Sequence, residues 1–408
     1  MLCNGGMDKN TPTTRRHDID ALRVLVFGLL ILYHVGMFYV ADWGWHVKSA
    51  YQSETLQMFM RMVNQWRMPL LFVISGIASS FLFAKLGAGG FASGRTRRLL
   101  IPLLFGMAVV VLPQAYYEAR FRGAIEPGYV NFLWHYFTFQ PWPEGAFAGS
   151  ENGVTWMHLW YLPYLLCYSL AFVPIAMWLN GPGRSTHARV LRVRGPWLIV
   201  LPIIPLIIYA NTLFPIFGSS NHGLLNDWYA HAMFFTFFAY GYLLAADAGI
   251  WAEIRRLRWW TLGLAMFFYC LMRIPSGDIP PNLERLAEWL SSPVIMFNRW
   301  LWILTILGWS FTLLNRPYRW LAYANEAVYP WYILHQTITV WIGFHIARYS
   351  LGPVIEPMIV IGVTIVGCLL LHEFLIRRNR WLRPLFGLKP TAGSQQAIKA
   401  PTTQAARA

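Results

Sequence analysis

The feature that most constrains this chain is a series of apolar segments, each long enough to cross a lipid bilayer. A membrane-spanning α-helix needs roughly 20 mainly apolar residues. The sequence contains ten candidate segments, at residues 20–41, 66–84, 99–117, 158–179, 196–215, 228–247, 259–274, 294–314, 323–343 and 354–376. Only 12% of the residues are charged, against about 25% in soluble domains. We therefore predict an all-α, polytopic integral membrane protein of about ten transmembrane helices.

The basic residues predict the orientation of these helices. With the N-terminus inside, 24 of the 33 Lys and Arg residues fall in internal segments, and every internal loop is basic. Cytoplasmic loops carry such an excess, so both termini are predicted to be cytoplasmic. The formal charge of +15 then reflects topology, and we predict membrane lipids, not nucleic acid, as partners. Residues 18–384 form the predicted membrane domain, between polar segments 1–17 and 385–408 that we predict to be disordered.

The first apolar segment contains three ionisable side chains, Asp20, Arg23 and His34. Arg23 and His34 are eleven residues apart, about three turns at 3.6 residues per turn, so they project from nearly the same face. Asp20 lies one turn before Arg23 on the same side. Ionisable residues in membrane helices are costly and normally face a protein interior or a water-filled cavity. This helix is therefore predicted to line a functional site.

His34 is the leading candidate for a general base. It lies in the outer half of the first segment, where burial favours the neutral imidazole, the form that can accept a proton. The alternative is a structural histidine bonded to a backbone carbonyl. The match in helical phase with Arg23 favours a role in chemistry.

A basic cluster lies at the same predicted cytoplasmic level as Arg23. Arg95, Arg97 and Arg98 come just before the third segment, and guanidinium groups bind phosphate in a bidentate manner. A phosphorylated cofactor is one interpretation, and ordinary positive-inside anchoring is the other. The sequence has no glycine-rich phosphate loop, metal-ligand spacing or nucleophile elbow, and we predict no bound metal.

Residues in or near two later segments are candidates for a substrate face. The outer segment 118–157 is rich in tryptophan and leads into His158-Leu-Trp160. Sugar rings stack on indole rings, although tryptophans at span ends also form interfacial belts. The ninth segment places Glu326, His335 and Gln336 in or near the membrane, and we include them among the candidates.

Five motifs, taken in order, resemble those of the membrane acyltransferase-3 family. They are Asp20-Ala-Leu followed by Arg23 and His34, MPLLFVISG (68–76), RTRRLLIP (95–102), HLWYL (158–162) and YPWYILHQ (329–336). Their form is most similar to the subgroup of periplasmic glucan succinyltransferases. The resemblance implies a multi-pass enzyme of the bacterial cytoplasmic (inner) membrane. Such an enzyme moves an acyl group from cytoplasmic acyl-CoA to a hydroxyl of an extracytoplasmic carbohydrate, such as a glucan.

The resemblance also implies roles for individual residues. By motif position, His34 is the catalytic base, Arg23 its paired arginine and Arg98 a ligand of the CoA phosphates. The other candidates are Asp20 for catalysis, Arg95, Arg97 and Ser75 for acyl-CoA, and His158, Trp160, Glu326, His335 and Gln336 for the acceptor. Candidate donors to the tetrahedral oxyanion are Tyr33, Gln336 and His335.

One departure from many relatives is the lack of a glutamate in the fourth segment, which reads LWYLPYLLCY. Either the subgroup dispenses with this acid, or Asp20 or Glu326 replaces it. Acetyl-CoA and succinyl-CoA are both compatible donors. Succinyl would need a cation near the reaction centre, and Arg67 and Arg299 are available near outer span ends.

The sequence is also compatible with other functions. A transporter or flippase would use the helix of Asp20, Arg23 and His34 to line its pathway, although no repeat relates the two halves of the chain. An acyltransferase that acts on a lipid or peptide is a further alternative. The oligomeric state is open, with a homodimer as one option.

Overall fold

The computed structural model describes residues 15–245, 247–274, 280 and 282–389. Within these ranges the chain is mainly helical, and the one strand-like pairing is an isolated bridge between Val40 and Ser53. The predicted all-α class is therefore confirmed. Most of the two polar ends that we predict to be disordered lies outside the described residues.

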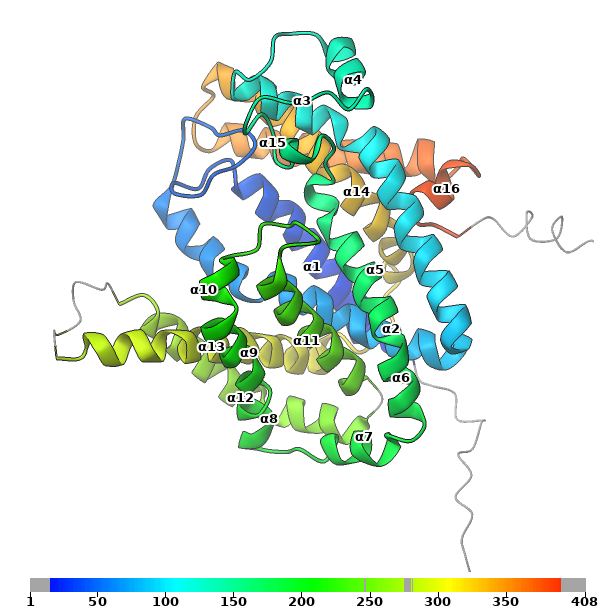
Figure 1. The fold of residues 1–408 in the computed structure, drawn as a ribbon, viewed down its shortest axis with the longest axis vertical. Coiled ribbons are helices and arrows are strands. Elements are labelled where there is room, and N and C mark those ends of the chain that lie inside the picture. The colour runs from blue at the N-terminus through cyan, green and yellow to red at the C-terminus, as the bar shows by residue number, and fades with distance from the viewer. Residues whose placement is uncertain (1–14, 246, 275–279, 281, 390–408) are drawn as a thin grey trace, which may run out of the picture.

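The chain forms a bundle of long helices with shorter ones around it (Figure 1). In order, the elements are α1 (His17–Gly36), α2 (Glu54–Phe105), η1 (Gly106–Val110), α3 (Leu112–Phe121), α4 (Tyr129–Phe137), η2 (Ser150–Asn152), η3 (Met157–Trp160), α5 (Tyr161–Ala171), α6 (Val173–Asn180), α7 (Arg184–Val190), α8 (Pro196–Val200), α9 (Ile203–Thr212), α10 (Phe214–Phe217), α11 (Trp228–Leu244), α12 (Ala248–Leu271), α13 (Glu284–Leu313), α14 (Leu321–Ile346), η5 (Ala347–Tyr349), α15 (Ile355–Leu370), η6 (Leu371–Ile376) and α16 (Leu382–Leu385).

Some of these helices are suited to cross a membrane. Among the described residues, four helical segments are long and apolar enough: His17–Gly36, Glu54–Val110, Glu284–Leu313 and Ile355–Ile376. The number rises to six if two bent pairs, η3–α5 with α6 and α11 with α12, are each one span. The count of ten spans and the cytoplasmic position of both termini stay predictions.

Two predicted segments differ in the structure for identifiable local reasons. Segment 196–215 is divided into α8, α9 and α10, with Pro202 and Pro215 at the breaks, because proline lacks a backbone N–H and clashes with the preceding turn. Helix α12 begins at Ala248, well before the predicted start at 259. Asp247 caps it by accepting a hydrogen bond of 2.6 Å from the Ile250 N–H.

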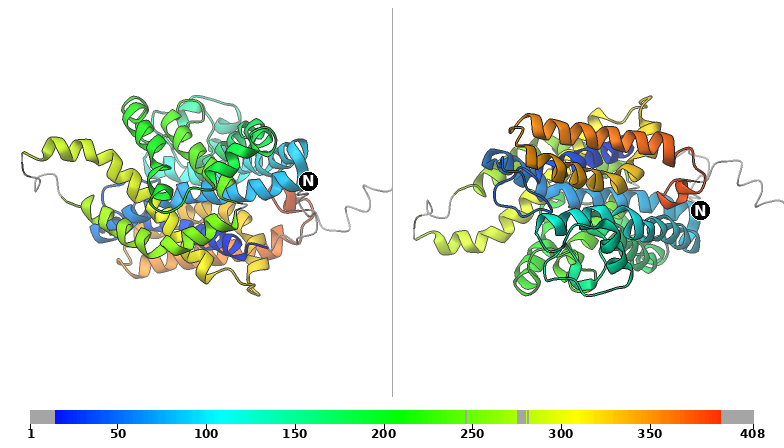
Figure 2. Two further views of the ribbon diagram at one scale, coloured as in Figure 1. Left: turned by 90° about the horizontal axis from the view of Figure 1, so that it is seen from below. Right: turned by 90° about the horizontal axis from the view of Figure 1, so that it is seen from above.

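Helix α1 lies at the centre of the bundle, in contact with α2, α13, α14 and α15. Its side chains Ile19, Leu22, Val26 and Leu30 are buried at helical spacing, whereas Leu25 is 51% exposed. Views from the two opposite ends show α1 enclosed by these neighbours (Figure 2). The helix that the sequence singles out is therefore in a position to line an internal site.

The predicted spans 66–84 and 99–117 lie on two helical arms of α2, which are separated by a sharp break at Gly87. Gly87 has φ 66° and ψ 178°, a conformation that suits glycine because it has no Cβ. Beyond Gly87 the second arm of α2 rises toward α3 (Figure 1). The first arm packs closely on α11, because a Cβ on Gly76 would overlap the Phe238 backbone and a Cβ on Gly241 would overlap the Val73 backbone.

The beginning of α1 and the C-terminal segment meet at the same end of the bundle. Asn325, near the start of α14, accepts a hydrogen bond of 2.5 Å from Arg23. The next residue, Glu326, lies 3.2 Å from Arg383 of α16. Phe386 packs on Phe105, with ring centroids 5.4 Å apart, so the packed chain extends slightly beyond the predicted boundary at residue 384.

The packed chain also begins slightly before the predicted boundary at residue 17. Arg15 pairs with Asp20 at 2.9 Å. Arg16 pairs with the fully buried Asp18 at 2.7 Å, and its guanidinium lies 3.8 Å from the Trp251 ring centroid. These contacts fix the start of α1 against α12.

We expect Gly241→Ala to destabilise the protein by about 1–3 kcal/mol, because a methyl group there would push α11 away from α2. The measurement is the thermal unfolding midpoint of the purified protein in detergent. Gly28→Ala is the matched control, because nothing lies within 4 Å of a Cβ at that helical position. An equal midpoint for both variants would contradict the proposed close packing.

Candidate functional site

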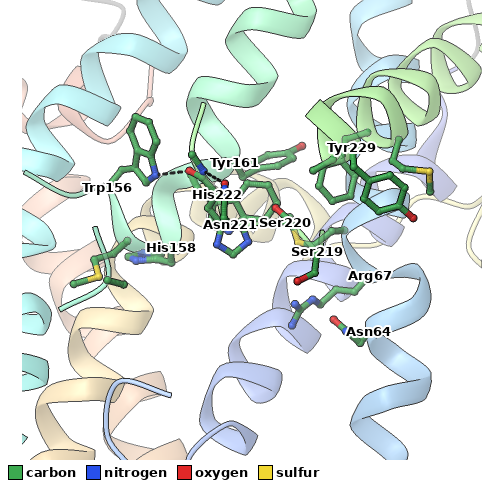
Figure 3. A pocket seen from close by; sticks show the side chains of 18 of the residues that line it. Asn64, Arg67, Trp156, His158, Tyr161, Ser219, Ser220, Asn221, His222 and Tyr229 are labelled. Carbon is green, nitrogen blue, oxygen red and sulfur yellow. Dashed lines mark hydrogen bonds between the residues drawn. The ribbon is translucent and has the colours of Figure 1, made fainter. Parts of the chain in front are cut away.

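A cavity of about 1650 Å³ lies beside the C-terminal half of α1. It is larger than the roughly 300–1,000 Å³ of common ligand pockets. Its walls come from α1, α2, α5, α11, α13, α14 and the segments 42–46, 148–160 and 219–226. Figure 3 shows Asn64 and Arg67 on one wall, with Trp156 and His158 across the cavity. His34 also lines the cavity, as its predicted role requires.

His34 is held by a histidine from α14. The Nδ1 atom of His34 lies 2.8 Å from the Nε2 atom of His335. On its other side, His335 Nδ1 lies 2.7 Å from the Tyr332 carbonyl. A carbonyl oxygen only accepts, so His335 Nδ1 carries the proton and His335 Nε2 is an acceptor in the neutral ring.

The protonation pattern of this pair follows directly. Because His335 Nε2 accepts, the Nδ1–H of His34 donates to it, and the lone pair of neutral His34 is on Nε2. His34 lines the cavity while His335 is fully buried. We predicted that His335 contacts the acceptor, but it lies behind His34 and orients it instead.

His158 lines the cavity, but both of its ring nitrogens are engaged. Nε2 donates to the Tyr332 and Ile333 carbonyls, each at 3.1 Å. Nδ1 lies 3.3 Å from the Gln114 amide nitrogen, which donates to it. His158 therefore has no free nitrogen for the acceptor and serves to fix η3 against α14.

Trp160 and its neighbour Trp156 belong to the cavity wall, as the predicted substrate face requires. The Trp160 ring stacks on His222, with centroids 4.3 Å apart and an interplanar angle of 19°. The indole N–H of Trp156 donates to the His222 carbonyl at 3.1 Å (Figure 3). These contacts hold segment 219–226, which precedes α11, at the cavity wall.

Gln336 connects α14 to a second histidine, which sequence reasoning did not select. The amide nitrogen of Gln336 lies 2.8 Å from His46 Nε2, and both residues line the cavity. His46 Nδ1 lies 2.5 Å from a carboxylate oxygen of Glu118, which is fully buried. No periodicity relates His46 to Glu118, so only the folded chain reveals this pair.

Arg67 is a buried cation on the cavity wall. It is 8% exposed, and its guanidinium carbon lies 3.5 Å from the Tyr33 ring centroid. Its Nε and Nη1 atoms have no hydrogen-bond partner, and none of the described carboxylates forms an ion pair with it. A buried charge without a partner is costly, so this position favours an anionic ligand.

Arg23 and Asp20 lie together at the opposite end of α1 from His34. Arg23 is 3.4 Å from Asp20 and bonds Asn325 of α14. Neither side chain lines the cavity. The predicted pairing of Asp20 with Arg23 is present. Polar side chains of α14 contact α1 at two positions, at Arg23 and at His34.

The basic cluster approaches the cavity through Ser75 and Tyr161. Arg95 bonds the Ser79 hydroxyl at 2.5 Å and lies 3.5 Å from the Ser75 carbonyl. The Ser75 hydroxyl is 2.6 Å from the Tyr161 hydroxyl, and Tyr161 lines the cavity. Arg97 and Arg98 are exposed, which fits both a site for a charged ligand and positive-inside anchoring.

The structure does not place Glu326 with the acceptor site. Its carboxylate pairs with Arg383 and Arg377 at 3.2 and 3.8 Å, and it does not line the cavity. Asp20 is likewise engaged by Arg15 and Arg23. Neither Asp20 nor Glu326 therefore supplies a carboxylate to the cavity. Glu118 is connected to the cavity through its hydrogen bond with His46.

Comparisons with known proteins give a family and several curated relatives. The family described as "Acyltransferase domain" matches residues 16–373. The chain is 24% identical to glucans biosynthesis protein C of Escherichia coli K12 over 416 residues, covering 96% of this chain and 98% of the relative. The proteins of the same name from E. coli strains SMS-3-5 and 536 match with the same identity and coverage. No solved structure matches the chain.

We expect the cavity to open on the extracytoplasmic side, because its rim carries the predicted outer segments. In a background with the native cysteines replaced by alanine, Asn221→Cys should react with a membrane-impermeant maleimide in intact cells. Arg97→Cys is the matched control and should react only after permeabilisation. The reverse labelling pattern would contradict the predicted orientation.

Proposed function

This chain belongs to the acyltransferase family, and we propose that it moves an acyl group from cytoplasmic acyl-CoA to a hydroxyl of an extracytoplasmic carbohydrate. The observation that carries the proposal is the orientation of His34, whose Nε2 lone pair is set by His335 at the wall of a large cavity. The name of the E. coli relatives, glucans biosynthesis protein C, supports a glucan as the acceptor.

In the proposed reaction, His34 Nε2 takes the proton of the acceptor hydroxyl as its oxygen attacks the thioester carbonyl. The tetrahedral intermediate collapses with cleavage of the carbon–sulfur bond. The CoA thiolate then takes the proton from His34 and leaves as the thiol, so protons balance without another reactant. The oxyanion needs donors. His335 Nε2 accepts from His34, which leaves Tyr33 and Gln336 among the candidates.

The CoA phosphates are proposed to bind at the opposite end of α1, near Arg23, Arg95 and Arg98. The pantetheine arm then extends past Ser75 and Tyr161 toward His34. The rise of α1 supports this arrangement, since Arg23 and His34 are roughly 16 Å apart along the helix axis. The contact between Arg95 and the Ser75 carbonyl lies along this route.

Arg67 supports succinyl-CoA over acetyl-CoA as the donor. Its unpaired guanidinium lies on the same cavity wall as Tyr33, one residue before His34. A free carboxylate at the end of the acyl group would supply the missing counter-ion. An acetyl group would leave Arg67 unpaired.

We expect His34→Ala to lower label transfer from radiolabelled acyl-CoA to added glucan by about 100-fold or more, since general-base catalysis contributes about 10²–10⁴-fold. Acyl-CoA binding should be nearly unchanged. His345→Ala is the matched control, because His345 is on α14 but does not line the cavity. Equal transfer by His34→Ala and wild type would contradict the proposal. If folded wild type released no CoA, the transporter alternative would be favoured.

We expect Arg67→Gln to reduce kcat/KM for succinyl-CoA by about tenfold or more, the loss of a charged hydrogen bond. The value for acetyl-CoA should change little. Arg299→Gln is the control, because Arg299 also lines the cavity but donates to the Gln65 carbonyl. A parallel loss for both donors in Arg67→Gln would contradict a role in donor selection.

A further inference from the structure

The pair formed by His46 and Glu118 is a polar centre at the cavity that the proposed reaction does not use. His46 comes from the segment after α1, and Glu118 comes from α3. Glu118 is fully buried, and it also pairs with Arg122. Burial alone would raise the pKa of Glu118, but the hydrogen bond from His46, the Arg122 guanidinium and the Ala148 backbone N–H bring that pKa below its ordinary value. The carboxylate is therefore ionised at neutral pH.

The ionised carboxylate fixes the orientation of the His46 ring. A carboxylate only accepts, so the Nδ1–H of His46 donates to Glu118. In the neutral ring this leaves the lone pair on Nε2, which accepts the Gln336 amide N–H at 2.8 Å. A carboxylate that orients a histidine in this way is the arrangement found behind the histidine of serine hydrolases.

His46 and His34 are neighbours in the same cavity wall. Both rings contact Trp45, with centroids 4.5 Å and 5.4 Å from the indole. Consecutive residues of α14 hold them, since His335 bonds His34 and Gln336 bonds His46. Two histidines, each with its Nε2 lone pair set by a partner, therefore line one cavity.

We propose that His46, positioned by Glu118, binds a second hydroxyl of the acceptor beside the one that reacts at His34. The inference rests on the proposed function and specifies its acceptor as a molecule with neighbouring hydroxyls, as sugar rings have. The acceptor hydroxyl replaces the Gln336 N–H at His46 Nε2. Gln336 is then free to donate elsewhere in the cavity. No bond is made or broken at His46, which orients the acceptor while His34 moves the proton.

The test compares His46→Gln with wild type in detergent, using succinyl-CoA and a short glucose oligosaccharide as the acceptor. We expect KM for the oligosaccharide to rise by about three- to tenfold, the loss of one neutral hydrogen bond. The KM for succinyl-CoA should change little. Glu118→Gln should produce the same selective rise, because it removes the group that orients His46.

Arg122→Gln separates this role from a structural one. If Glu118 acted only as an ion-pair anchor for Arg122, Arg122→Gln and Glu118→Gln would raise the acceptor KM equally, which would overturn the proposal. An unchanged acceptor KM in His46→Gln would also overturn it and leave the proposed function intact. Wild type that releases no CoA would refute the proposed function itself.

A second variant covers the case in which His46→Gln does not fold. His46→Gly leaves space for free imidazole at the position of the lost ring. Recovery of the low acceptor KM on addition of imidazole would support the proposal, and a KM unaffected by imidazole in folded His46→Gly would overturn it.

Discussion

The contact between α1 and α14 is the interaction on which the candidate site depends. Polar pairs join these helices at two levels: Arg23 with Asn325, and His34 with His335. Buried polar groups are costly unless they are hydrogen-bonded, so sliding α14 by one turn would leave both pairs unsatisfied. The same register places His34, with the lone pair of its neutral ring on Nε2, at the cavity wall. Positioning of the base is therefore part of how the bundle is held together.

The sequence predicted the α1 face well because helical phase is a local property. Asp20, Arg23 and His34 are related by spacing alone, and their side chains lie as that spacing requires. The partners on α14 were less predictable. Adjacent residues on a helix point about 100° apart, so Asn325 faces Arg23 whereas Glu326 faces Arg383. Which of two neighbouring polar residues faces inward depends on packing between helices.

Predictions failed where the chain departs from regular helix. Prolines divide segment 196–215, although they are visible in the sequence. By contrast, the non-helical Gly87 separates the predicted spans 66–84 and 99–117 into two helical arms. The pair of His46 and Glu118 was missed for another reason. It joins the segment after α1 to α3 across 72 positions, and no periodic pattern relates side chains brought together by loops. The fourth segment has no carboxylate, and Glu118 of α3 is connected to the cavity through its hydrogen bond with His46.

The position of Tyr161 bears on how donor and acceptor meet. Tyr161 lies between the cavity and the arginine cluster, and its hydroxyl bonds Ser75 and the Leu71 carbonyl at 2.6 and 3.2 Å. Arg95, Arg97 and Arg98 do not line the cavity. On the proposed route, the pantetheine arm must displace Tyr161 from these bonds before a thioester can reach His34. Both bonds are made to α2. Donor entry would therefore be coupled to this helix, which carries Arg67 before the turn at Gly87 and Arg95 after it.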